Sequence, residues 1–264
     1  MANKVYASTT AITALWEKIK SLAGVPQLPY TEVEWVESNG KQIVYLDWKP
    51  GINTFGFAAD FIIRNAFTTS VGEWDASTNI NGYGSVFGTR NSSGVNDVQL
   101  TSYTASGTLR IGNSTSVSSG IKTDKSRQQI SLIGASLTKA DGTTVSVTRR
   151  DEVADKPCAN MTIFAMHDGL RRSGSGNLIQ PATVRIYSLK FYNGTDLAVD
   201  LIGAVRKSDG VTGLYDKVSQ HFYPAPGMTY GSAVRDFGDK DSVLRITEKS
   251  AIKTFIYNLT DTRM

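Results

Sequence analysis

The sequence predicts an all-β protein made of two antiparallel sheets, and three observations lead to this fold class. Apolar residues alternate with polar ones in short segments that recur about every ten residues between residues 31 and 223. The dipeptides Asp141-Gly142 and Asn193-Gly194 are typical of two-residue hairpin turns. Glycine, serine, threonine and asparagine are abundant, as loops between strands require. The length of 264 residues fits one large sandwich with added segments at its ends.

The candidate strands of the first half of the chain are separated by turn residues. Residues 31–49 predict a pair of strands around the turn Ser38-Asn39-Gly40. Residues 55–63 alternate most cleanly and predict a half-buried core strand, and residues 65–84 form a long polar loop. Further short strands are expected at residues 85–89, 98–103, 109–111, 129–133, 143–148 and 161–166. Short strands at regular spacing are typical of a sandwich.

Residues 181–224 are the stretch around which the prediction is organised, because they form a tight antiparallel meander. Strict alternation over residues 184–191 puts Val184 and Ile186 on one face of a strand, and Leu189 and Phe191 on the other. The turn at Asn193-Gly194 leads to a returning strand whose apolar face is expected to hold Leu197, Val199, Leu201 and Val205. A turn at residues 208–210 precedes two shorter strands, at residues 212–215 and 221–223.

Three stretches carry a resemblance to a known family. They are LPYTEVEWVESNGKQIVYLDWKP (residues 28–50), MTIFAMHDG (residues 161–169) and RIYSLKFYNGTDLAVDLIGAVRKSDGVTGLYDKVSQHFYPAPG (residues 185–227). Together they resemble the concanavalin A-like, laminin-G-like jelly roll that occurs in gut bacteriophage proteins and in surface proteins of gut bacteria. The resemblance covers residues 28–230 and implies a two-sheet jelly-roll sandwich with separate segments at residues 1–27 and 231–264.

The resemblance also singles out a signature around the turn at residues 208–210. It implies a structural role, and not ligand binding, for Arg206, Asp209, Gly210, Gly213, Tyr215 and Asp216. A charged arginine near an inner strand needs a partner, so Arg206 is expected to pair with Asp200 or Asp216.

The two ends of the chain differ in character from the strands between them. An apolar stripe at helical spacing predicts a short N-terminal helix, ended by Gly24, and it consists of Ile12, Leu15, Trp16, Ile19 and Leu22. This stripe either packs on its own sandwich or contacts copies of itself or another virion protein, and the linker with Pro26 and Pro29 favours the second. The C-terminal tail is expected to be helical over about residues 248–258, although residues 243–247 fit a strand equally well.

The sequence contains no convincing catalytic or metal-binding set. Glu32, Glu34 and Glu37 resemble the E-x-D-x-x-E strand of jelly-roll glycoside hydrolases, but they sit on the first strand, where the non-enzymatic module carries a solvated face. His167 and Asp168 are neighbours on a strand and point to opposite faces. We therefore predict no catalytic residues, no metal and no cofactor, with calcium at the rim left open by the family resemblance.

The polar loop at residues 68–83 is the candidate sugar site. Trp74, Asn81 and Tyr83 lie there among glycine, serine and aspartate residues. Aromatic rings stack on the apolar faces of sugars, and amide groups bind their hydroxyls. The alternative is that Trp74 folds back and anchors its own loop.

Charge and composition restrict the possible partners. The net charge of +4 is spread along the chain and no apolar run approaches a membrane span, so neither nucleic acid nor membrane insertion is expected. A single cysteine and no signal-peptide core favour assembly in a host cytoplasm. We expect a bacteriophage head-fibre, capsid-decoration or tail-fibre protein on the particle surface, whose partners are further copies (such as a trimer), other virion proteins and host glycans. A free carbohydrate-binding lectin and a jelly-roll glycoside hydrolase are the alternatives.

Overall fold

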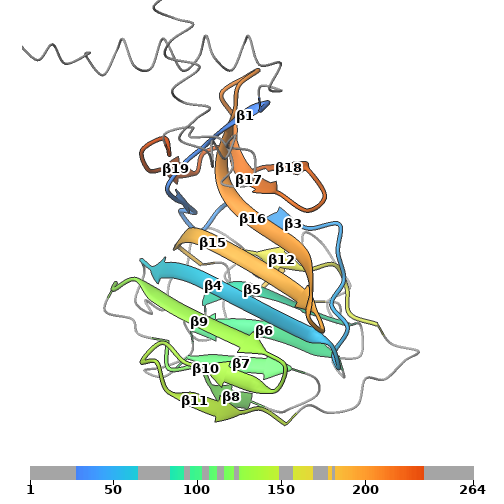
Figure 1. The fold of residues 1–264 in the computed structure, drawn as a ribbon. Coiled ribbons are helices and arrows are strands. Elements are labelled where there is room, and N and C mark those ends of the chain that lie inside the picture. The colour runs from blue at the N-terminus through green and yellow to red at the C-terminus, as the bar shows by residue number, and fades with distance from the viewer. Residues whose placement is uncertain are drawn as a thin grey trace, which may run out of the picture.

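The computed structural model describes residues 28–64, 84–91, 96–102, 107–111, 116–121, 125–148, 157–168, 178–179 and 182–234. Across these residues the chain forms strands, turns and bends, with no helix. The strands make two sheets that lie face to face over one hydrophobic core (Figure 1). The predicted all-β class is confirmed. Both expected helices lie outside the described residues.

The larger sheet has eleven strands among the described residues, and all its pairs are antiparallel. In spatial order its main path is β11 (Thr144–Ser146), β10 (Ser136–Thr138), β9 (Gln128–Ile133), β4 (Phe55–Ile63), β15 (Val184–Asn193), β16 (Asp196–Arg206), β17 (Thr212–Asp216) and β18 (His221–Pro224). Off this path, β1 (Tyr30–Glu32) pairs with β16, and β2 (Val36–Glu37) pairs with β15 and β19 (Thr229–Tyr230).

The smaller sheet has eight strands in the part of the chain that is described. Its path is β14 (Leu178–Ile179), β13 (Met166–Asp168), β5 (Gly84–Arg90), β6 (Asp97–Ser102), β7 (Thr108–Ile111) and β8 (Ser116–Ser118), with β12 (Thr162–Ile163) joining β5 to β3 (Val44–Tyr45). β12 is antiparallel to β5 but β13 is parallel to it. The chain turns between them at Phe164, whose φ is 69°, so the single strand expected at residues 161–166 is two strands.

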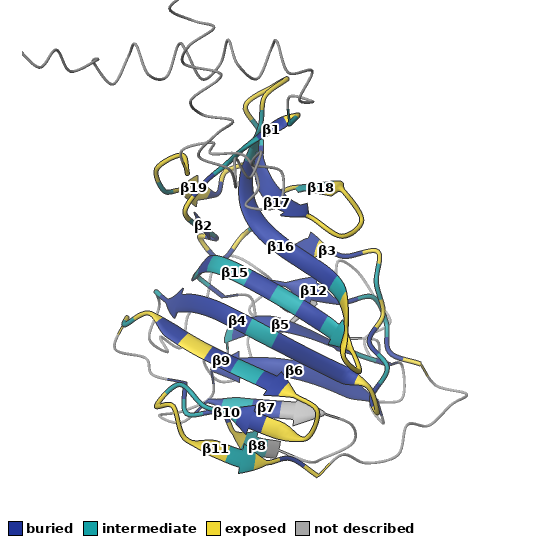
Figure 2. Cartoon of the chain, viewed as in Figure 1, coloured by how far each residue is buried: buried dark blue, intermediate teal, exposed yellow. Residues whose placement is uncertain are grey.

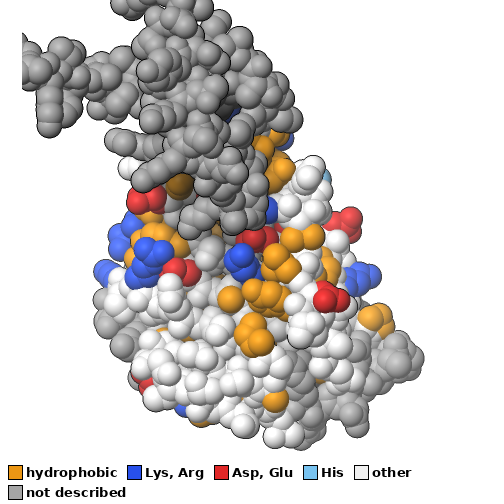
Figure 3. Space-filling view, in the orientation of Figure 1, with side chains coloured by type: hydrophobic (Ala, Val, Ile, Leu, Met, Phe, Trp, Pro, Cys, Tyr) orange, Lys and Arg blue, Asp and Glu red, His pale blue; other side chains and the backbone are white. Residues whose placement is uncertain are grey.

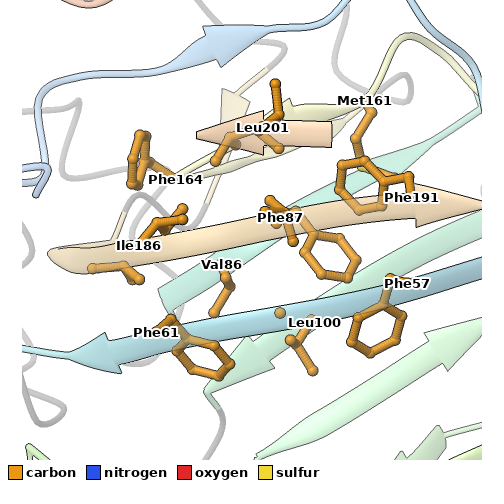
Figure 4. Close-up of a cluster of buried hydrophobic side chains, with 14 of the residues drawn as sticks. Phe57, Phe61, Val86, Phe87, Leu100, Met161, Phe164, Ile186, Phe191 and Leu201 are labelled. Carbon is orange, nitrogen blue, oxygen red and sulfur yellow. The ribbon is translucent and has the colours of Figure 1, made fainter. Parts of the chain in front are cut away.

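Phenylalanine side chains dominate the core between the two sheets. β4 contributes Phe55, Phe57 and Phe61, all buried, from alternate positions on its inner face. Phe87 of β5 lies across from them, with its ring centroid 5.1 Å from that of Phe57 and 5.0 Å from that of Phe191 on β15 (Figure 4). Aromatic rings bury large apolar areas, so this cluster is the main source of sheet-to-sheet stability. Figure 2 shows the buried residues concentrated along β4, β5, β6 and β16.

β15 departs from strict alternation at a bulge. Ile186 pairs with Phe61 and Ser188 with Asp60, which leaves Tyr187 as an extra residue. Beyond the bulge, Leu189 and Phe191 are buried in the same core as Ile186. The prediction that Leu189 and Phe191 lie on the opposite face is therefore wrong. Side chains alternate between the two faces of a strand, so one extra residue moves all the following side chains to the other face.

β16 contains a second irregularity of the same kind. Phe191 pairs with Val199 but Tyr192 pairs with Leu197, so Ala198 is the extra residue. Leu197 is 39% exposed, whereas Val199 is buried. The expectation that these two side chains share one apolar face is wrong for the same physical reason.

The hairpin turns predicted at Asn193-Gly194 and Asp141-Gly142 are confirmed. The strand pair predicted around Ser38-Asn39-Gly40 is wrong, because β2 before this turn pairs with β15 and β19, whereas β3 after it pairs with β12 of the other sheet. Asn193-Gly194 joins β15 to β16, and Gly194 has the positive φ of 67° that glycine adopts without strain. Asp141-Gly142 joins β10 to β11. Gly213 of the signature is required for a steric reason and not for its φ. A Cβ at that position would overlap the carbonyl oxygen of Tyr223.

The first and last described segments lie side by side at one end of the molecule (Figure 1). Val33 forms a bridge with Ala233. The amide of Glu34 donates to the carbonyl of Ser232 over 3.0 Å, and the amide of Val234 donates to that of Glu32 over 2.9 Å. Pairing therefore continues past residue 230, where the sequence placed the end of the sandwich.

The phenylalanine core makes a prediction about stability. Truncating Phe57 to alanine should lower the free energy of unfolding by about 3–5 kcal/mol, since it removes a fully buried ring and leaves a cavity. The measurement is urea denaturation followed by intrinsic fluorescence. Val218→Ala is the matched control at a position that is 46% exposed, and its effect should be within about 0.5 kcal/mol. Equal effects of the two changes would contradict the assignment of the core.

Candidate functional site

The outer face of the larger sheet carries polar and aromatic side chains, which strand pairing arranges in cross-strand rows. Figure 3 shows hydrophobic, basic and acidic side chains together on this side of the molecule. Residues that pair directly across strands share a face of the sheet. The pairs Ala58–Ser131, Ala58–Lys190 and Lys190–Asp200 therefore place one row across β9, β4, β15 and β16. Lys190 Nζ lies 3.1 Å from Asp200 Oδ2. We call this surface the outer face and define it by the outward side chains of β2, β4, β9, β15 and β16.

The second row is centred on Asp60 of β4. Its carboxylate accepts two hydrogen bonds from Arg127, at 2.7 Å from Nε and 2.9 Å from Nη2, and a third at 2.9 Å from Nε2 of Gln129. The guanidinium carbon of Arg127 lies 3.7 Å from the centroid of the Tyr187 ring. The hydrogen bonds to Asp60 raise the pKa of Arg127, although burial opposes them. This bidentate geometry fixes both side chains in one orientation.

A third group sits at the junction of β2 and β15. Arg185 donates from Nε to Glu37 Oε2 over 2.8 Å, and Arg64 Nε lies 3.3 Å from the same oxygen. The guanidinium of Arg185 stacks on Trp35, 3.5 Å from the ring centroid. Burial lowers the pKa of Arg185, but hydrogen bonds to Tyr187 and Glu37 outweigh it and the pKa is raised.

The fourth row is apolar and lies towards the β15–β16 hairpin. Tyr192 pairs with Gly56 on one side and with Leu197 on the other. Its Cβ and Cδ2 lie 3.3 and 3.8 Å from the point that a Gly56 Cβ would occupy, so the tyrosine leans across the glycine. Ile133 at the end of β9 is 50% exposed. An aromatic ring, a glycine and exposed aliphatic side chains thus meet on one surface.

The glutamates of the first strand are not brought together as a catalytic set. Glu37 is bound by two arginines, Glu34 is exposed in the segment between β1 and β2, and Glu32 pairs with Ala204 of β16. The carboxylates of Glu32, Glu34 and Glu37 therefore lie in three different environments.

The signature residues form the turn between β16 and β17, and the partner of Arg206 differs from the expectation. Arg206 pairs with Asp209, at 2.6 Å between Nη2 and Oδ2, and not with Asp200 or Asp216. Its side chain is 36% exposed at the strand end, where Asp209 lies three residues away. Asp209 Oδ1 also accepts from the amide of Val211, and Gly210 has a φ of 71°. The arginine holds the turn and is not an inner-strand charge.

Asp216 organises the next turn. Its Oδ1 accepts from the amide of Asp200 at 2.8 Å and from the amide of Val218 at 3.1 Å. Its Oδ2 accepts from the Ser219 hydroxyl at 2.6 Å. Asp216 is buried, so these hydrogen bonds compensate for the loss of water around its charge.

Tyr215 lies on the outward side of β17 in a small apolar cluster with Tyr30, Ile202 and Ala204. The ring centroids of Tyr215 and Tyr30 are 3.9 Å apart. Burial raises the pKa of the Tyr215 hydroxyl, and the nearby charge of Asp216 adds to this effect.

The remaining candidates are distributed elsewhere or lie outside the described residues. The sugar candidates Trp74, Asn81 and Tyr83 fall in residues 65–83, and the attachment stripe falls in residues 1–27, neither of which is described. His167 contacts Tyr45 edge-on with centroids 6.1 Å apart. Within the described ranges, no three His, Cys, Asp or Glu side chains are arranged to hold a metal ion. Nor does any helix in those ranges have the length and hydropathy to cross a membrane.

No protein-family model matches the chain, and a search of curated proteins finds no significant match.

Sequence reasoning missed the outer face, although signals for it were present. Asp60 interrupts the apolar run of residues 55–63, and Arg185, Tyr187 and Lys190 alternate with core residues along residues 184–191. On a strand with one buried face, such residues lie on the opposite face. Their grouping could not be predicted, since it depends on the pairing of β4 with both β9 and β15.

The two turn aspartates make a prediction about the signature. Asp216→Ala should lower the free energy of unfolding by about 2–4 kcal/mol, because it leaves buried donors without an acceptor. Asp209→Ala should have a much smaller effect, since its ion pair is exposed and screened by water. Both are measured by urea denaturation. A larger loss from Asp209→Ala would mean that the Arg206 ion pair is the more important interaction.

The raised pKa of Tyr215 predicts that the free energy of unfolding depends on pH. A tyrosine whose pKa is raised in the folded state favours folding fully below the unfolded value of 10.0, and that contribution is lost as pH rises through the folded pKa. The free energy of unfolding should therefore fall above pH 10.0, and more steeply than in Tyr215→Phe. Denaturation curves at several alkaline pH values test this. Identical pH profiles for the two proteins would contradict it.

Proposed function

We propose that this chain is a non-enzymatic structural protein of a bacteriophage virion, a head-fibre, capsid-decoration or tail-fibre component. In this proposal its sandwich is a concanavalin A-like jelly roll, assembled in the host cytoplasm and exposed on the particle surface. The N-terminal segment attaches it to copies of itself, such as a trimer, or to other virion proteins. The sandwich projects outward and adheres to host or mucosal glycans.

The observation that carries the proposal is the pairing of the first described segment with the last one. The bridge between Val33 and Ala233, with the hydrogen bonds on either side of it, holds the entering and leaving segments at one end of the sandwich. β10, β11 and β8 lie at the other end (Figure 1). A domain whose flanking segments both start at one end can be anchored there while the rest of its surface stays free. This arrangement suits a projecting module.

The strand order supports the jelly-roll part of the proposal. β4 pairs with β9 on one side and with β15, a distant part of the chain, on the other. Such non-sequential antiparallel neighbours arise in sandwiches with Greek-key connections.

The absence of catalysis in the proposal follows from how the carboxylates are engaged. Retaining and inverting glycosidases both need two carboxyl groups that flank one scissile bond. Glu37 is bound by Arg64 and Arg185, and Asp60 by Arg127 and Gln129. Both carboxylates are thus held by neighbouring side chains of the sheet, and among the described residues neither is placed with a second carboxyl group to flank a substrate bond. We therefore assign these residues to positioning and binding.

A free lectin is the second candidate function. The half-buried aromatic and polar side chains of the outer face are compatible with it, because a binding surface would serve a free lectin and a virion adhesin equally. The two candidates differ in whether residues 1–27 attach the protein to a particle.

Removal of the N-terminal segment tests the proposal. Deleting residues 1–24 should leave a soluble, folded sandwich, since β4, β5 and β15 already build a continuous core from residues 55–191. The same deletion should abolish self-association and incorporation into particles. Leu15→Asp combined with Ile19→Asp should act likewise, because it places two charges in the apolar stripe. Light scattering and particle composition are the measurements.

A matched control places the same charges outside the stripe. Lys18→Asp combined with Ser21→Asp should leave self-association unchanged. The proposal fails if the full-length protein is monomeric and the truncated protein unfolds. In that case the stripe belongs to the core of its own domain.

A further inference from the structure

We infer that the outer face of the larger sheet is a binding surface for a neutral glycan chain, with Tyr192 as its stacking ring. Gln129, Lys190 and the Asp60–Arg127 pair supply its polar contacts. This inference rests on the adhesive part of the proposed function and names the surface and the chemical class of its ligand. The surface is formed by β4, β9, β15 and β16 and is separate from the loop at residues 68–83.

Two bulges create this surface. The extra residue Tyr187 in β15 is the one on which Arg127 stacks, and the extra residue Ala198 in β16 turns Leu197 outward beside Tyr192. In a sheet without bulges, inward and outward residues would alternate without interruption along both strands. Bulges are over-represented near functional sites, where they re-aim side chains, and here both re-aim side chains onto the same face.

The polar groups of the surface are held rigidly before any ligand binds. Asp60 is held by three hydrogen bonds, and Arg127 is held by both Asp60 and the ring of Tyr187. Arg185 is fixed in the same way between Glu37 and Trp35. Side chains that are already ordered lose little entropy on binding, so a weakly binding ligand such as a sugar gains affinity from this order.

Tyr192 has the position of a stacking platform. It leans across Gly56, and its cross-strand partner Leu197 is exposed, as is Ile133 at the end of β9. The C–H faces of a sugar ring are apolar, while its hydroxyls need hydrogen-bond partners. Along β4, Gly56 and Ala58 present little or no side chain outward, so a ligand can approach the sheet between Gln129 on β9 and Lys190 on β15.

The charges of the outer face indicate a neutral ligand. Among the described residues of this face, four basic side chains are paired with carboxylates: Arg127 with Asp60, Lys190 with Asp200, and Arg64 and Arg185 with Glu37. Glu34 adds a further exposed carboxylate near Arg127. Four basic groups are thus balanced by four acidic ones. A surface for an anionic polysaccharide or nucleic acid would leave basic groups in excess.

Purely structural ion pairs are the competing explanation, and binding measurements separate the two. Cellohexaose, maltohexaose and mannohexaose serve as neutral probes, and hexagalacturonate as an anionic probe, titrated calorimetrically into the full-length protein. At least one neutral probe should bind, and more tightly than hexagalacturonate. Tyr192→Ala should weaken that binding by about tenfold or more, as expected for an aromatic anchor. Gln129→Ala should weaken it less.

Tyr45→Ala is the matched control, because Tyr45 is a 48% exposed tyrosine on a strand of the smaller sheet. It should leave glycan binding unchanged. The inference is overturned if no neutral probe binds, if hexagalacturonate binds more tightly, or if Tyr45→Ala abolishes binding while Tyr192→Ala does not. Tyr192→Ala should still self-associate and enter particles. A loss of those properties, with glycan binding intact, would instead count against the attachment part of the proposed function.

Discussion

The pairing of β4 with β15 is the constraint on which the rest of the structure depends. It joins two segments far apart in the sequence along almost their whole length, from Ile63 opposite Val184 to Phe55 opposite Asn193. Closing so long a loop costs chain entropy, and only burial of a large apolar surface can offset it. Phe57, Phe61 and Phe191 provide that surface, and Phe87 of the facing sheet completes it. β9 then adds to β4, and β16 to β15, so the larger sheet grows outward from this pair.

The same pairing decides what the outer face contains. Every inward phenylalanine of β4 leaves a neighbour pointing outward, and these neighbours are Gly56, Ala58, Asp60 and Ile62. Small residues at one end and a carboxylate near the other are unusual on a strand that is otherwise apolar. The bulge at Tyr187 restores the core register after Ile186 and supplies a ring for Arg127 on the outer side. Core packing and the polar network are thus two consequences of one register.

In the proposed function, attachment and recognition would use different parts of the sandwich. The bridge between Val33 and Ala233 closes one end, and the outer face lies along the flank formed by β9, β4 and β15. The signature residues near the closed end hold turns through short local contacts, as Arg206 with Asp209 and Asp216 with Ser219 illustrate. A substitution on the outer face would therefore leave the pairing of the first and last described segments unchanged.

The sequence by itself determined the class of fold, most strand positions and the tight turns. It did so because these depend on local properties: alternation along residues 55–63, the Asn193-Gly194 dipeptide, and the need for glycine at positive φ. Only the tertiary structure decided the bulges at Tyr187 and Ala198, the choice of Asp209 as partner of Arg206, and the gathering of Asp60, Arg127 and Gln129. A bulge forms where packing against neighbouring strands favours a shifted register, and a cross-strand row exists only once distant strands have paired. Neither condition can be evaluated from residues that are neighbours in the chain, since the interacting partners lie far away along it.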